Sequence, residues 1–292
     1  MAPRLSAEMP EGLEITHHVT RITHHGSRTM KTLFANRMHI SFAILALLLL
    51  LFIAWPLLRT VTASGPALLW QTILDEEVRR AIGLTFYASF IATAIAFLCG
   101  VPLAYLLARA DFPGRRLVEG LVDLPIVVPH SAAGIALLMV FGRQTFLGQA
   151  FGLFGVRFVS ALPGIVIAML FVSLPFLVNA AREGFEAVDP RLERVSRTLG
   201  GSPWRTFWGV SFPLAWRSIL SGAILMWARG LSEFGAVIIL AYHPMVTPVL
   251  LYERFESFGL RYAQPVAALV ILICLAVFII LRLIGGRKER AR

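Results

Sequence analysis

The chain has 292 residues, of which 57% are hydrophobic and 15% are charged. The apolar share is well above that of an ordinary soluble domain, and the charged share is well below it. A net charge of +10 at pH 7 would favour a nucleic-acid partner in a soluble protein, but here the basic residues lie mainly in short segments between long apolar runs. The composition therefore excludes a soluble nucleic-acid binder and indicates an integral membrane protein.

Residues 1–37 are polar and irregular in pattern, and we interpret them as a cytoplasmic N-terminal tail. The pairs His17-His18 and His24-His25 lack an acidic or cysteine partner at ligand spacing, so we interpret them as solvated tail residues and not as a metal site.

Six stretches are apolar over about the 20 residues that a helix needs to cross about 30 Å of hydrocarbon. They are residues 40–58, 81–108, 124–142, 158–181, 218–242 and 264–281. The sequence therefore predicts an all-α integral membrane protein with six transmembrane helices. We place this domain at residues 38–285 and a basic C-terminal end at residues 286–292.

The basic residues predict the orientation of these helices. Nineteen Lys and Arg residues lie in the N-terminal tail, in the loops 109–116 and 182–217, and from Arg282 to the C-terminus, whereas seven lie in the alternate loops. Because cytoplasmic loops carry an excess of Lys and Arg, both termini are expected in the cytoplasm.

The cytoplasmic segment 182–217 contains a short helix with good end signals. Asp189 suits the N-cap and Pro190 the first helical position, while Gly200 supplies a left-handed stop. Three apolar residues recur between them at steps of three and four: Leu192, Val195 and Leu199. Such an apolar face either packs on the chain's own membrane domain or docks on another protein.

The fifth apolar stretch carries two charges, Arg229 and Glu233, although each charge costs about 2.5–3.5 kcal/mol in the middle of a span. Four residues apart on one helical face, they can pair. Either they only neutralise each other, or they face a water-filled path where Arg229 presents positive potential to an anion. We favour the second interpretation.

The third stretch reads LPIVVPHSAAG, with Pro125 and Pro129 followed by His130 and Ser131. Proline bends a helix and exposes carbonyl groups, which are tolerated in a membrane only beside protein or a water-filled cavity. His130 and Ser131 are therefore candidates for the same path, with a buried packing role as the alternative for His130.

The spacing within segment 182–217 resembles the cytoplasmic signature of binding-protein-dependent ABC importer permeases. That signature is Glu-Ala-Ala, a glycine four residues later, nine further residues and Ile-x-Leu-Pro. Gly200 occupies the glycine position and Pro213 the last one, but Arg194, Val195 and Ser196 replace Glu-Ala-Ala. In that family the segment is the coupling helix, which docks in a groove of the ATPase subunit.

The resemblance implies that the docking residues include Asp189, Leu192, Glu193, Arg194, Val195, Ser196, Leu199, Gly200 and Pro213. We expect Glu193 to substitute in part for the missing glutamate of the triplet. No G-x-x-x-x-G-K-[ST] motif occurs in the chain, so the ATPase is expected to be a separate polypeptide.

The run ARGLSEFGAVIILAYHPMVTPVLLYERF and the third-span LPIVVPH resemble permeases of molybdate/tungstate ABC importers, and the Ala-Arg-x-x-x-Glu-Phe-Gly core also resembles sulfate permeases. The resemblance implies a type I importer fold in a prokaryotic plasma (inner) membrane. It also implies a homodimer, two ATPase subunits that carry ATP and Mg²⁺, and an extracytoplasmic oxyanion-binding protein.

On this interpretation the chain is a transport subunit, not an enzyme, with no cofactor of its own and no nucleic-acid partner. A sulfate or thiosulfate importer is the first alternative. The second is an ATP-independent anion carrier that uses Arg229 and Glu233 as a proton-linked switch.

Overall fold

A computed structural model describes the backbone of residues 13–286 and the side chains of residues 38–279. The chain divides into two units, residues 1–63 and 64–292. The described part of the first is helix α1 (Leu13–Ala63), whose part Met38–Ala63 is long and apolar enough to cross a membrane. Helix α1 thus begins within the predicted N-terminal tail, and the cytoplasmic location of that tail stays a prediction. Residues 1–12 and the basic C-terminal end from residue 287 lie outside the described part.

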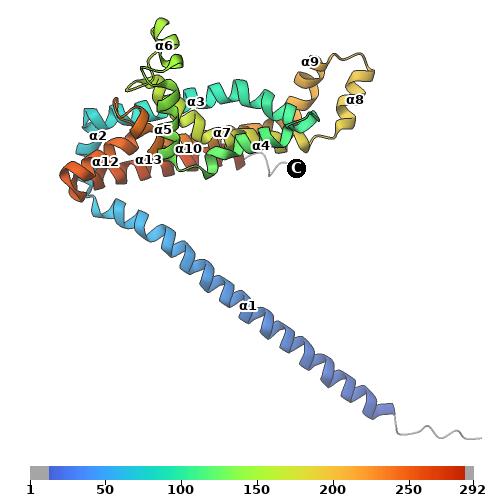
Figure 1. Ribbon diagram of the computed structural model, residues 1–292. Helices are drawn as coiled ribbons and strands as arrows, with labels where there is room; N and C mark the ends of the chain where they lie inside the picture. The colour runs from blue at the N-terminus through green and yellow to red at the C-terminus, as the bar shows by residue number, and fades with distance from the viewer. Residues whose placement is uncertain (1–12, 287–292) are drawn as a thin grey trace, which may run out of the picture. The chain divides into compact units, whose positions relative to one another are not determined.

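The regular secondary structure of the second unit is all helical within its described residues (Figure 1). Its elements are α2 (Pro66–Leu74), α3 (Glu76–Arg109), α4 (Arg115–Val127), α5 (His130–Phe141), α6 (Phe146–Leu153), α7 (Leu162–Glu186), α8 (Pro190–Thr198), α9 (Pro203–Thr206), the π-helical turn Phe207–Ser211, α10 (Phe212–Leu231), α11 (Gly235–Leu240), α12 (Thr247–Phe258) and α13 (Leu260–Gly286).

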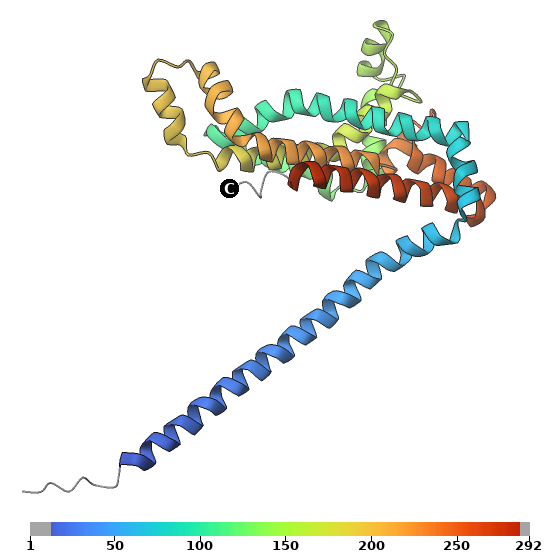
Figure 2. The same cartoon turned by 180° about the vertical axis from the view of Figure 1, so that it is seen from behind.

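The core of this unit forms where α3, α7 and α10 run side by side (Figure 2). Small residues allow these helices to approach closely: a Cβ atom on Gly100 of α3 would lie 3.1 Å from Val178 of α7. A Cβ atom on Gly222 of α10 would lie 2.7 Å from Ala180. Lipid tails are as apolar as the side chains, so such close packing, and not the hydrophobic effect, holds membrane helices together.

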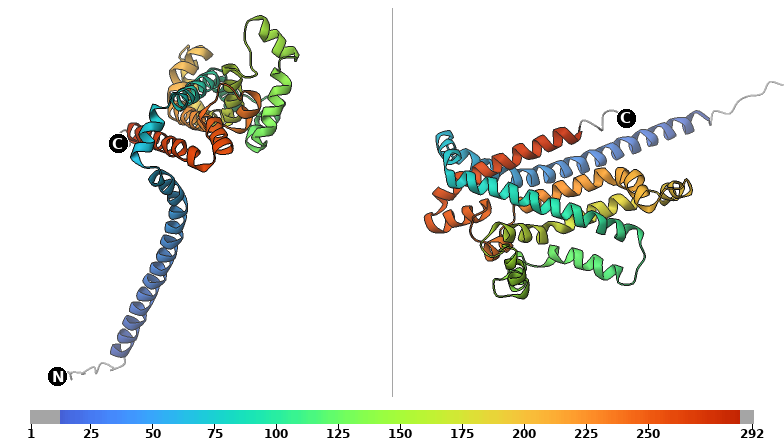
Figure 3. Two further views of the ribbon diagram at one scale, coloured as in Figure 1. Left: turned by 90° about the vertical axis from the view of Figure 1, so that its left-hand side faces the viewer. Right: turned by 90° about the horizontal axis from the view of Figure 1, so that it is seen from above.

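The short helices gather at the two ends of this bundle. The α8–α9 hairpin projects from one end, and α2 and α12 lie at the other (Figure 3, right). Among the described residues of the whole chain, α1 included, five helices are long and apolar enough to cross a membrane, or six if the bent pair α4 and α5 forms one span. The prediction of an all-α membrane protein is confirmed.

The third expected span is not one straight helix. α4 and α5 meet at an angle of 117°. Pro129 lies at the break, and Val128 before it has the extended backbone (φ −68°, ψ 130°) that proline favours in the residue preceding it. Pro125, by contrast, lies inside α4.

The fifth expected span, 218–242, is also wrong as a continuous helix. α10 ends at Leu231, and α11 begins only at Gly235. The helix that is long and apolar enough to span is Pro203–Leu231, so it includes part of the expected cytoplasmic segment 182–217. Pro213 lies in its interior and cannot donate a hydrogen bond to the preceding turn, and the π-helical turn Phe207–Ser211 comes just before it.

Candidate functional site

Arg229, Glu233 and His130 form one cluster where two broken helices meet. The Nη2 atom of Arg229 lies 3.1 Å from Oε2 of Glu233 and 2.9 Å from Nδ1 of His130. Nδ1 of His130 is also 3.1 Å from Oε2 of Glu233. The structure thus brings together three of the four residues expected along a path, from segments that are about 100 residues apart in the chain.

The Glu233 side chain is 0% exposed, and it lies in the break between α10 and α11. Its Oε1 accepts a hydrogen bond of 2.9 Å from the backbone N–H of Ala236, in the first turn of α11. The carboxylate therefore satisfies a backbone donor that the break would leave unpaired. The expectation that Arg229 and Glu233 pair is confirmed, although they do not share one continuous helix.

α5 and α11 pack backbone against backbone around this cluster. A Cβ atom on Gly235 would lie 2.8 Å from Cβ of His130, and one on Gly134 would lie 3.0 Å from the Cα atom of Ala236. Any side chain at either glycine would push the two helices apart. The glycines therefore fix the position of His130 relative to Glu233.

The chemistry of the cluster suits a weakly held anion. Arg229 and His130 are partly exposed, and His130 is the first residue of α5, where backbone N–H groups and the helix dipole favour negative charge. The buried Glu233 offsets much of the charge of Arg229. Ser131 is exposed on the next position of α5, and no hydrogen bond between its hydroxyl and the cluster is seen among the described residues.

The sequence interpretation missed a polar group that packs against Gly230, the residue after Arg229. Ser89 of α3 donates a hydrogen bond of 2.7 Å to the carbonyl of Trp227, and a Cβ atom on Gly230 would lie 2.5 Å from the Ser89 hydroxyl oxygen. The only signal was a serine within an apolar run, which is common in membrane helices. Ser89 therefore anchors the last turn of α10 before the break.

The helix expected after Asp189 is present as α8. The Asp189 carboxylate accepts a hydrogen bond of 2.8 Å from the backbone N–H of Arg191, and Gly200 has φ +83°. Ser202 caps α9 in the same way through the N–H of Arg205. Local end signals therefore account for where α8 and α9 begin and for the turn between them.

The apolar face of α8 points away from the described part of the second unit. Leu192, Val195 and Leu199 are 47%, 55% and 83% exposed. Arg194, at the first position of the family's triplet, is exposed as well. Of the two interpretations of this face, packing on the chain's own membrane domain is thus not seen within that unit.

Glu193 points inward instead. Its Oε1 accepts hydrogen bonds from Nε of Arg109 (2.9 Å) and from the hydroxyl of Ser211 (2.8 Å). Ser196, one turn later, shares a hydrogen bond of 3.0 Å with Thr206. The Glu193 carboxylate is therefore taken up by the chain's own fold, and its partial substitution for the glutamate of the family's triplet stays a prediction.

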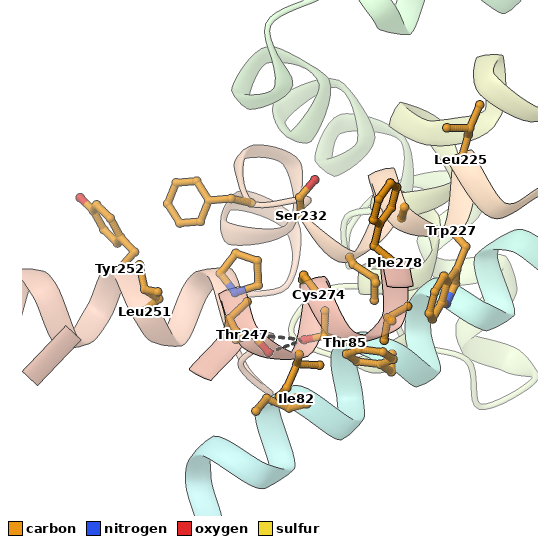
Figure 4. Close-up of a pocket in the computed structure, with 18 of the residues that line it drawn as sticks. Ile82, Thr85, Leu225, Trp227, Ser232, Thr247, Leu251, Tyr252, Cys274 and Phe278 are labelled. Carbon is orange, nitrogen blue, oxygen red and sulfur yellow. Dashed lines mark hydrogen bonds between the residues drawn. The ribbon is translucent and has the colours of Figure 1, made fainter. Parts of the chain in front are cut away.

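A cavity of about 790 Å³ lies between α3, α10, α12 and α13 (Figure 4). Its wall is apolar apart from a few groups such as Thr85 and Thr247, whose hydroxyl oxygens are 3.0 Å apart. None of the three cluster residues lines it. A dianion entering this cavity would lose its hydration without gaining a charged partner, so the cavity suits apolar chains and not an oxyanion.

Comparisons with known proteins identify the family of this chain. Residues 100–290 match the family of binding-protein-dependent transport system inner membrane components. The molybdate/tungstate transport system permease protein of Thermococcus kodakarensis is 45% identical over 250 residues, which cover 85% of this chain and 96% of the relative. A probable sulfate transport system permease protein of Marchantia polymorpha is 35% identical and covers 70% of this chain and 73% of the relative.

Solved structures show the same fold. A bacterial ABC transporter involved in the import of alginate matches with a TM-score of 0.71 and 17% identity, covering 90% of this chain and 99% of the transporter chain. A bacterial alginate ABC transporter in complex with an alginate-bound periplasmic protein matches with a TM-score of 0.66 and 17% identity, covering 84% and 94% of the two chains. The chain therefore belongs to the family of binding-protein-dependent transport system inner membrane components and has the fold of an ABC importer permease.

Proposed function

We propose that this chain is the permease subunit of an ATP-driven importer for molybdate or tungstate in a prokaryotic plasma membrane. The observation that carries the substrate is the 45% identity to a molybdate/tungstate permease over nearly the full length of that relative. Two copies of the chain, two separate ATPase subunits and an extracytoplasmic binding protein make up the complete machine.

The cluster of Arg229, His130 and Glu233 is the proposed point of contact with the oxyanion. Arg229 and the start of α5 supply positive potential, while Glu233 limits it. A path that held a dianion tightly would not release it, so weak contact suits transport better than strong contact. High affinity then belongs to the binding protein.

α8 is the proposed coupling helix. Its apolar face of Leu192, Val195 and Leu199 is exposed, which is costly in water unless another protein covers it. In this proposal closure of the ATPase pair moves α8 and so switches the path between inward- and outward-facing states. ATP shifts the balance of the two states because the closed ATPase pair binds one of them better.

A sulfate importer is the second candidate, favoured by the 35% identity to a sulfate permease. The complete system in proteoliposomes, with its binding protein, distinguishes the two. We expect unlabelled tungstate to compete with labelled molybdate uptake at least about tenfold better than sulfate does, a difference of roughly 1.4 kcal/mol. Uptake of labelled sulfate at the same rate as molybdate would overturn the substrate proposal.

A further inference from the structure

α8 does not bury its apolar side chains as a surface helix ordinarily does, although its arginines are exposed. Its apolar residues are exposed, whereas Glu193 and Ser196 bond to the chain's own fold. Each inward contact is one helical turn from the next. α8 therefore has one face attached to this chain and another free for a partner.

The Glu193 carboxylate joins three elements. Arg109 is the last residue of α3, Glu193 lies in α8, and Ser211 ends the π-helical turn before α10. Arg109 also donates a hydrogen bond of 2.8 Å to the carbonyl of Val188, in the link from α7 to α8. The ends of two core helices, α3 and α10, are thus tied to α8 through one carboxylate.

These contacts are shielded from water. The Arg109 and Glu193 side chains are each 15% exposed, and Ser211 is fully buried. Charge-assisted hydrogen bonds in such surroundings are stronger and more directional than pairs at the surface. The main-chain link from α8 to α9, in contrast, contains Gly200 and Gly201, which resist rotation little.

We infer that Arg109, Glu193 and Ser211 form a transmission joint that makes α8 move together with the ends of α3 and α10. The inference rests on the proposed coupling role of α8. In the joint Glu193 is a positioning residue and makes no contact with the ATPase. Without it α8 still docks through its apolar face and stays linked to α7, but less of its movement reaches the ends of α3 and α10, because the Gly200-Gly201 link yields and only the hydrogen bond of Ser196 with Thr206 remains across it.

The test uses the complete importer in proteoliposomes with three variants. Glu193→Ala breaks the joint, and Val195→Asp places a charge on the exposed apolar face. Glu183→Ala is the matched control, because Glu183 is an exposed carboxylate in α7. The readouts are co-purification of the ATPase, basal ATP turnover with its KM, and stimulation of turnover by the oxyanion-loaded binding protein.

For Glu193→Ala we expect normal co-purification, basal turnover and KM for ATP, with stimulation lowered roughly fivefold or more, the usual range of coupling between two sites. Val195→Asp should lose co-purification, and Glu183→Ala should resemble the unsubstituted protein. Loss of co-purification in Glu193→Ala, or normal stimulation, would overturn the joint. Normal assembly and stimulation in Val195→Asp would instead contradict the coupling role of α8.

Ser211→Ala covers the case in which Glu193→Ala does not fold. It removes a single hydroxyl and leaves the pair of Arg109 and Glu193 in place. We expect a smaller loss of stimulation with unchanged assembly. Full stimulation in Ser211→Ala would count against the joint.

Discussion

Replacement of Arg229 by leucine would leave the buried Glu233 without its cation. The Glu233 side chain has no exposure, so water cannot replace the guanidinium. Removing one partner of a buried pair costs about 3–5 kcal/mol. The N–H of Ala236 and the ring of His130 still contact the carboxylate, so we expect a cost near the lower end of that range.

Arg229→Leu alone therefore confuses a loss of stability with a loss of transport. Adding Glu233→Gln removes the buried charge, and the amide oxygen of glutamine can still accept from Ala236. We expect the double variant to recover most of the thermal unfolding midpoint that the single variant loses in detergent, while molybdate uptake per assembled complex stays low. Normal uptake by the folded double variant would show that the pair serves stability alone.

Two further predictions concern packing and pH. Gly235→Ala should destabilise the protein by about 1–3 kcal/mol, because the added Cβ would meet His130. The control Gly83→Ala in α3, whose added Cβ meets no atom within 4 Å, should not lower the unfolding midpoint. Equal midpoints for the two variants would contradict the close packing of α5 on α11. At the start of α3, burial acts to raise the pKa of Asp75, but the hydrogen bond and charge of Arg254 and two backbone N–H groups lower it on balance. The pair of Asp75 and Arg254 stabilises the fold at neutral pH, where the carboxylate is charged. The difference in unfolding midpoint between Asp75→Asn and the unsubstituted protein should therefore shrink as pH falls below about 4. A difference that grows on acidification would refute the stabilising role of the charged carboxylate.

Features determined by neighbouring residues were predictable from the sequence. The start and end of α8 follow from Asp189, Pro190 and Gly200, each of which acts on the backbone within a turn. The apolar length of α3, α7 and α13 likewise follows from composition alone.

Features that depend on contacts between distant segments were not predictable. The helix break after Leu231 could not be inferred, since the residues up to Tyr242 are apolar enough for one continuous helix. That break is stabilised by the contact of Glu233 with His130, two residues that meet only in the fold. Arg109 was counted only as evidence of topology. Its bond to Glu193 joins residues 84 positions apart, which no local pattern reveals.

The most direct test of the central claim is the energy source of uptake. Proteoliposomes containing this chain with its ATPase should accumulate labelled molybdate or tungstate only when ATP reaches the ATPase and the loaded binding protein is on the opposite side. Vesicles containing this chain alone should show no uptake under a proton gradient. Accumulation by the chain alone, driven by that gradient, would contradict an ATP-driven importer and favour an ion-coupled carrier.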